Sequence, residues 1–98
     1  MSDALTRLQT WYLDQCDGDW EHQQGIRIST LDNPGWSLKI NLRGTALEER
    51  QFRTQCFDWE DKHRWCKCEV VDHAFHAYCG AQGLSKAIEV FLGWAETV

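Results

Sequence analysis

Residues 25–43, GIRISTLDNPGWSLKINLR, decide the fold of this 98-residue chain. Apolar and polar side chains alternate on both sides of DNPG, which is the pattern of two β-strands with one buried and one solvated face. Proline presets φ and glycine tolerates positive φ, so Pro34 and Gly35 suit the central positions of a type II turn. The stretch predicts a β-hairpin whose buried face includes Ile26, Ile28, Trp36, Leu38 and Ile40.

Three more strands are expected after the hairpin. Residues 52–59 have an ambiguous pattern, whereas residues 64–71 and 74–79 alternate clearly, and Asp72 and His73 can form the turn between them. The inward-facing side chains of the last two strands would be Cys66, Cys68, Val70, Phe75, Ala77 and Cys79.

Helices are expected at both ends of the chain. Residues 4–16 have apolar side chains at three- and four-residue steps, with Asp3 or Ser2 as the N-cap and Gly18 as the residue that ends the helix. Residues 84–97 have a second, broader apolar stripe. The first stripe consists of Ala4, Leu5, Leu8, Trp11, Tyr12 and Cys16.

These elements predict a two-layer α+β fold. A five-stranded antiparallel sheet would bury one face under the N-terminal and C-terminal helices. The chain length suits one domain, residues 1–98.

Charge is distributed unevenly along the chain, which has a formal net charge of −5. Residues 1–34 contain six acids but only Arg7 and Arg27 as bases. Such a lobe repels phosphate backbones and attracts basic partners.

The chain start and the cysteines indicate the compartment. The start, MSDALTRLQ, has no basic segment followed by an apolar run, so no signal peptide is expected. No apolar stretch approaches the roughly 20 residues that span a bilayer. The five cysteines are an odd number without a disulfide-framework spacing, so we expect free thiols in a reducing cytoplasm.

Motifs for catalysis or metal binding are missing. Counted back from Gly18, the segment DQCDGDWE lacks the oxygen ligands of an EF-hand loop. Cys66 and Cys68 are spaced too closely for a structural zinc site, although His63, His73 and His76 are near enough in sequence to keep a small zinc-binding protein as an alternative. No nucleophile elbow or phosphate loop is present. We expect no enzyme activity, no cofactor and no bound metal.

The sheet face that the helices leave open suggests another use. Basic and aromatic side chains would lie on it, as in modules that bind single-stranded nucleic acid. The net negative charge argues against that alternative. The side chains are Lys39, Arg43, Trp65, Lys67, His76 and Tyr78.

A second candidate surface is the stretch CDGDWEH, residues 16–22. Acids at the end of a helix are unfavourable because a helix C-terminus carries partial negative charge. One explanation is a docking surface for a basic protein, with Trp20 as aromatic anchor beside Asp17, Asp19, Glu21 and His22. The other is local, because Asp17 and Asp19 can accept backbone N–H groups in a turn.

The motifs CDGDWEH, G-I-x-I-x-T-LDNPGW and G-T-x-L lie within residues 11–48. Together they resemble the immunity protein 53 family of bacterial polymorphic toxin systems. The resemblance extends more weakly to Trp94, and residues 50–71 are less typical. It implies an antitoxin that binds and blocks a cognate toxin protein.

Many toxins of such systems are nucleases, and an acidic antitoxin suits their basic clefts. The expected contacts are the acidic stretch around Trp20 or, as the other patch, Trp65 and Tyr78. The sequence leaves the oligomeric state open.

Overall fold

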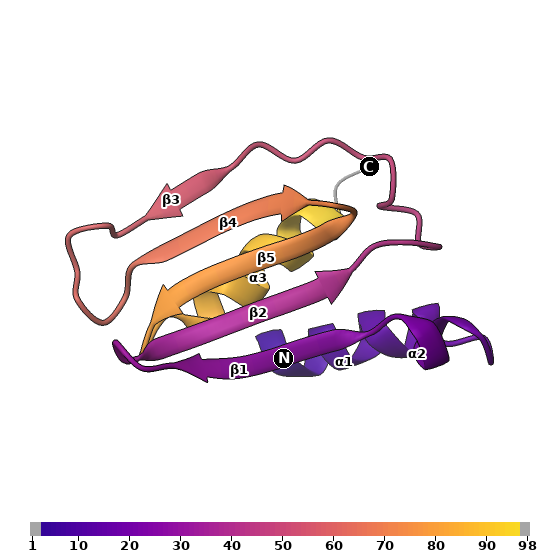
Figure 1. Cartoon of the computed structure of the whole chain (residues 1–98), viewed down its shortest axis with the longest axis horizontal. Helices are drawn as coiled ribbons and strands as arrows, with labels where there is room; N and C mark the ends of the chain where they lie inside the picture. The colour runs from indigo at the N-terminus through magenta and orange to yellow at the C-terminus, as the bar shows by residue number, and fades with distance from the viewer. Residues whose placement is uncertain (1–2, 97–98) are drawn as a thin grey trace.

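The computed structural model describes residues 3–96, which form three helices and five strands (Figure 1). None of these helices is long and apolar enough to cross a membrane. In chain order the elements are α1 (Ala4–Gln15), α2 (Trp20–Gln23), β1 (Ile26–Leu31), β2 (Gly35–Asn41), β3 (Gln55–Phe57), β4 (Cys66–Val71), β5 (Ala74–Gly80) and α3 (Leu84–Ala95).

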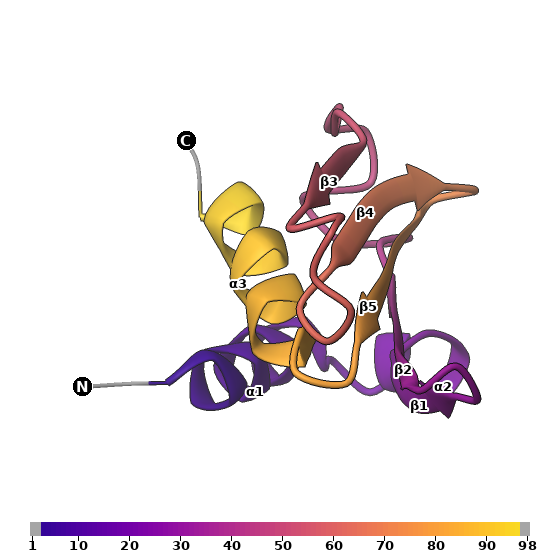
Figure 2. The same ribbon diagram turned by 90° about the vertical axis from the view of Figure 1, so that its left-hand side faces the viewer.

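The five strands form one antiparallel sheet in the order β1-β2-β5-β4-β3. Two hairpins, β1-β2 and β4-β5, are joined by the long-range pairing of β2 with β5. Figure 2 shows the two long helices, α1 and α3, together on one side of this sheet, whereas the short helix α2 lies beside β1 and β2. The predicted α+β fold is confirmed.

Strand alternation places the core on the helix side. Leu38 lies opposite Ile28 on β1 and opposite Ala77 on β5, and these three side chains point toward the helices. On β5, Phe75, Ala77 and Cys79 are fully buried. The predicted strand faces are therefore correct for the central strands.

Phe91 of α3 connects the two layers. Its ring packs edge-on against Trp11 of α1 at 4.9 Å and against Phe75 of β5 at 5.2 Å. Each such aromatic contact adds about 0.5–1.5 kcal/mol beyond the burial of the rings. One side chain thus holds both long helices on the sheet.

The turn of the first hairpin differs from the prediction. Leu31 pairs with Gly35, so the loop consists of residues 32–34, and the Asn33–Pro34 peptide bond is cis. Gly35 belongs to β2 and lacks positive φ, so the predicted type II turn is wrong. Glycine is needed there for another reason: a Cβ atom would lie 2.2 Å from the carbonyl oxygen of Cys79.

The turn of the second hairpin, between β4 and β5, agrees with the prediction. Asp72 and His73 both have positive φ, as a two-residue type I′ turn requires, and Val71 pairs with Ala74. The third strand is shorter than predicted, since only Gln55–Phe57 pair with β4.

The helix limits are close to those predicted. Asp3 caps α1, because its carboxylate accepts a hydrogen bond from the Thr6 N–H at 2.8 Å. Helix α1 ends with Cys16 as its C-cap, so Gly18 is not the residue that ends it. Ser2 and residue 97 lie outside the described residues.

Three apolar side chains predicted to be buried are exposed. Leu5 and Tyr12 of α1 are accessible, and Ile28 of the edge strand β1 is 39% exposed. The helix layer covers the middle of the sheet, whereas Ile28 on the edge strand β1 stays open to solvent.

Two glycine substitutions test the packing in opposite directions. Gly35→Ala should lower the free energy of unfolding by roughly 1–3 kcal/mol, because the methyl group collides with the β5 backbone. Gly93→Ala, in α3, should raise it by up to about 1 kcal/mol, because its Cβ meets no heavy atom within 4 Å and alanine favours helix. Urea denaturation measures both. Equal effects would contradict this account of the β2-β5 contact.

Candidate functional site

The acidic stretch after α1 begins a second helix. Residues 20–23 form the short helix α2, which the sequence analysis did not predict. Asp17, Asp19 and Glu21 therefore lie around a helix N-terminus, where negative charge is favourable. A cluster of acids after a glycine was the signal for this helix, since acids are enriched in a first turn.

The side chain of Trp20 is buried, with only 7% of its surface exposed. Its ring packs edge-on against Trp11 and Tyr12 of α1 at 6.0 and 5.9 Å. The indole Nε1–H donates to the Arg43 carbonyl oxygen at 2.8 Å, beyond the end of β2. The ring was expected to offer an exposed anchor, but it closes the core between α1, α2 and β2.

The carboxylates of Asp17 and Glu21 hold the loop before α2. Oδ1 of Asp17 accepts from the backbone N–H groups of Asp19 and Trp20, each at 2.9 Å. Glu21 accepts from the N–H groups of Asp17 and Gly18 at 2.9 and 2.8 Å. The local explanation thus accounts for Asp17 and Glu21.

These hydrogen bonds lower the pKa of both carboxyl groups. The backbone N–H of Trp20, then that of Asp19, lowers the pKa of Asp17. The pKa of Glu21 is lowered by its own backbone N–H first, then by those of Asp17 and Gly18. Both groups therefore stabilise the loop in their charged form.

Asp19 and His22 remain at the surface of this loop. Both side chains are exposed, and Asp19 makes no capping hydrogen bond to α2. Arg43, predicted on the open sheet face with Lys39, lies just beyond the end of β2, beside the acidic loop. Together with Asp17, Asp19 and Glu48 it lines an open hollow of about 400 Å³.

The sheet surface opposite the helices, here called the open sheet face, combines basic and aromatic side chains. Lys39 pairs across the strands with Arg27 on one side and His76 on the other, and His76 pairs with Glu69. In the next row Tyr78 pairs with Lys67, and its ring stacks on His76 at 6.4 Å. The register therefore brings Lys39, Lys67, His76 and Tyr78 together, as predicted.

Two tryptophans lie at one end of this face. Trp65 precedes β4 and packs edge-on against Trp59, with ring centroids 5.7 Å apart. The Trp59 ring is 63% exposed, and the two rings line an open hollow of about 320 Å³. Trp59 was not among the residues predicted for binding. Its position outside the apolar stripes of the sequence was the signal that could have identified it as a surface residue.

Three of the cysteines are structural. Cys66, Cys68 and Cys79 are fully buried on the helix side of the sheet. The hydrogen bond with Cys66 and burial raise the pKa of Cys68, and burial raises the pKa of Cys79 to about 11. The thiols of Cys68 and Cys79 therefore stay protonated at neutral pH, whereas the hydrogen bond with Cys68 lowers the pKa of Cys66. In residues 3–96 no three His, Cys, Asp or Glu side chains are grouped to hold a metal ion.

Truncation of the buried Trp20 and of the exposed Trp59 should lower the stability of the protein by different amounts. Trp20→Ala should lower the free energy of unfolding by about 3–5 kcal/mol, because it empties a buried site. Trp59→Ala should lower it by about 1 kcal/mol or less, because the ring is exposed. Urea denaturation compares them, and an equal cost would contradict the burial of Trp20.

The loop carboxylates predict a pH dependence. Because folding lowers their pKa values, their stabilisation is present at neutral pH and is lost as the pH falls through the folded pKa values. The double variant Asp17→Asn, Glu21→Gln should melt at a lower temperature than wild type at pH 7. Its melting temperature should also fall less steeply between about pH 5 and pH 2. If the melting temperatures of the variant and of wild type fell equally with pH, these carboxylates would not stabilise the fold.

Comparison with known proteins gives one match. The family model for immunity protein 53, Imm53, matches residues 5–96. No curated protein and no solved structure matches the chain. The model covers nearly the whole sequence and agrees with the motifs in residues 11–48. The chain belongs to the immunity protein 53 family.

Proposed function

We propose that this protein is an antitoxin that binds a cognate bacterial toxin and blocks it by protein–protein contact, without chemistry of its own. The family match over residues 5–96 carries this proposal. Further support comes from the grouping of aromatic side chains on a surface that neither long helix covers. The expected place of action is the cytoplasm of the cell that makes the toxin.

The toxin contact that we propose is the open sheet face together with the Trp59–Trp65 pair. Aromatic side chains on a rigid surface are frequent anchors of protein interfaces. Trp65 and Tyr78 are half-buried and held in place by neighbouring rings, so little conformational freedom is lost on binding. The acidic loop is the less favoured patch, because its tryptophan and two of its carboxylates already stabilise the fold.

The charges of the open sheet face suggest what lies against it. Arg27 and Lys39 are direct cross-strand partners, and like charges in such positions repel. The acidic residue among the described strand residues on this face is Glu69. Its Oε1 atom lies 3.8 Å from Nζ of Lys67. A toxin surface with carboxylates would relieve the repulsion between Arg27 and Lys39.

The acidic lobe suggests the class of the toxin. Six acids against two arginines in residues 1–34 suit a basic surface, such as the substrate cleft of a nuclease. We therefore propose a nuclease as the toxin, with its basic region near the acidic lobe.

One other function has a specific observation in its favour. Lys39, Lys67, His76 and Tyr78 together are also a plausible platform for single-stranded nucleic acid. That function predicts binding to an oligonucleotide at low salt that weakens steeply as salt rises. An antitoxin should show no such binding.

The proposal is tested with the toxin encoded beside this chain. Co-expression of the wild-type protein should rescue cells from that toxin, and the purified proteins should form a complex. Trp65→Ala and Tyr78→Ala should each weaken binding by about 30-fold, the effect of an interface hot spot of about 2 kcal/mol. Calorimetry measures the affinity, and thermal unfolding checks that each variant is folded.

Two control variants distinguish the surfaces. Glu89→Ala changes an exposed residue of α3 on the helix side and should leave affinity unchanged. Asp19→Asn with His22→Ala alters the acidic loop without removing its backbone hydrogen bonds. A loss of affinity in this variant alone would move the contact to the acidic loop, and absence of rescue by wild type would refute the function.

A further inference from the structure

Strand β1 forms a free edge of the sheet. It is the outermost strand, pairs only with β2 among the described strands, and is six residues long (Figure 1). Natural proteins often protect such an edge with proline, lysine or a bulge. The β1 sequence IRISTL contains no proline and has Arg27 as its one charged residue, and its pairing with β2 is continuous.

The register shows which backbone groups point outward. Asn41 N–H donates to the Gly25 carbonyl at 3.0 Å, so the pair 25–41 is hydrogen-bonded. Bonded and non-bonded pairs alternate in an antiparallel ladder. Arg27 and Ser29 therefore bond to β2, whereas Ile26, Ile28 and Thr30 direct their N–H and C=O groups to the free edge.

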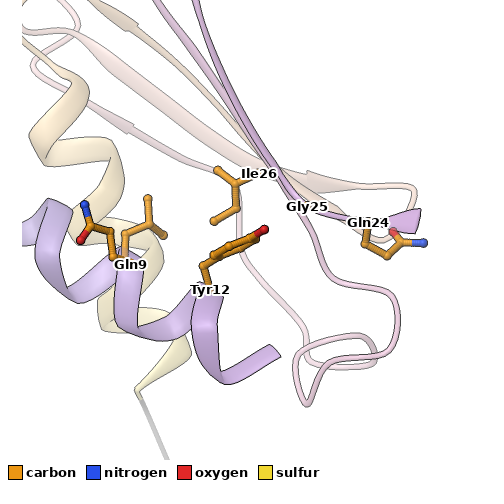
Figure 3. Close-up of a pocket in the computed structure, with 6 residues that line it drawn as sticks. Gln9, Tyr12, Gln24, Gly25 and Ile26 are labelled. Carbon is orange, nitrogen blue, oxygen red and sulfur yellow. The ribbon is translucent and has the colours of Figure 1, made fainter. Parts of the chain in front are cut away.

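The same edge is bordered by apolar surface on the helix side. Ile28 is 39% exposed. An open groove of about 380 Å³ lies between Leu8, Gln9 and Tyr12 of α1 and the segment 24–26. Figure 3 shows Tyr12 and Ile26 facing one another across it. A strand added to β1 would find apolar contacts for every second side chain.

We propose that β1 receives an extended segment of the toxin as a sixth strand of the sheet. This proposal rests on the proposed function and adds a second contact beside the open sheet face. Main-chain hydrogen bonds to Ile26, Ile28 and Thr30 provide the affinity, and apolar side chains of the segment enter the groove.

Charge favours a basic segment over a second copy of this chain. Asp17, Asp19 and Glu21 lie in the loop and the short helix α2 that lead into β1, so Lys or Arg at the adjoining end of the segment would be attracted. In antiparallel pairing, a second copy would place its own Asp32, which follows β1, against these acids. Like charges oppose that arrangement.

Hydrogen exchange and one substitution test the proposal with the toxin encoded beside this chain. In the complex, the amides of Ile28 and Thr30 should become protected, whereas those of Arg27 and Ser29 are protected already in the free protein. Thr30→Pro removes an outward N–H that β2 does not use, and it should weaken binding by about tenfold or more. The matched control Thr30→Val keeps the N–H and should bind like wild type.

Other outcomes would overturn the proposal. Unchanged exchange at Ile28 and Thr30, with wild-type complex formed, would exclude strand addition while leaving the antitoxin function intact. If Thr30→Pro does not fold, Ile28→Lys replaces it, since a lysine on the free edge strand should also prevent strand addition. If the free chain sediments as a dimer and the Ile28→Lys variant sediments as a monomer, the β1 edge binds a second copy of this chain instead of the toxin. Failure of wild type to bind the toxin would refute the function and this inference with it.

Discussion

The contact of Phe91 with Trp11 and Phe75 is the interaction on which the rest of the structure depends. It places α1 and α3 on the same side of the sheet, and this choice of side leaves the opposite face without a cover. From Phe91 a row of edge-on rings continues to Trp20 through Trp11, and to Phe52 through Phe75. Most aromatic residues of this small chain thus belong to its core, whereas Trp59 and Tyr78 are among those that reach the surface.

The acidic loop shows how one set of residues satisfies local and tertiary requirements together. Asp17 and Glu21 cap the backbone around α2, and this short helix positions Trp20 so that its indole reaches the Arg43 carbonyl. The loop thereby ties the end of β2 to the end of α1. The fold thus accounts for Asp17, Trp20 and Glu21 of the sequence CDGDWEH.

Period-2 and helical patterns were enough to predict both long helices, the strand faces and the two-layer fold, because each depends on neighbouring residues. The burial of Trp20 was not predictable in the same way, since its partner Arg43 is 23 residues away and lies beyond a strand whose position had first to be known. The exposure of Leu5, Tyr12 and Ile28 was missed for a related reason: a pattern identifies an apolar face, but only the packed layers show where that face ends. Alternation along the strand was enough to place Tyr78 on the open sheet face, whereas the contact of Trp59 with Trp65 joins two segments and required the structure.

Alternation along the central strands has an evolutionary consequence. Lys39, Lys67, His76 and Tyr78 alternate with Leu38, Cys66, Phe75 and Ala77, so positions of the open sheet face are interleaved with positions that maintain the core. If the open sheet face binds the toxin as proposed, a point substitution at the first kind of position changes recognition at little cost in stability. Lineages can therefore diversify in specificity by single codon changes, whereas an insertion or deletion of one residue would exchange the two sets and destroy both properties at once.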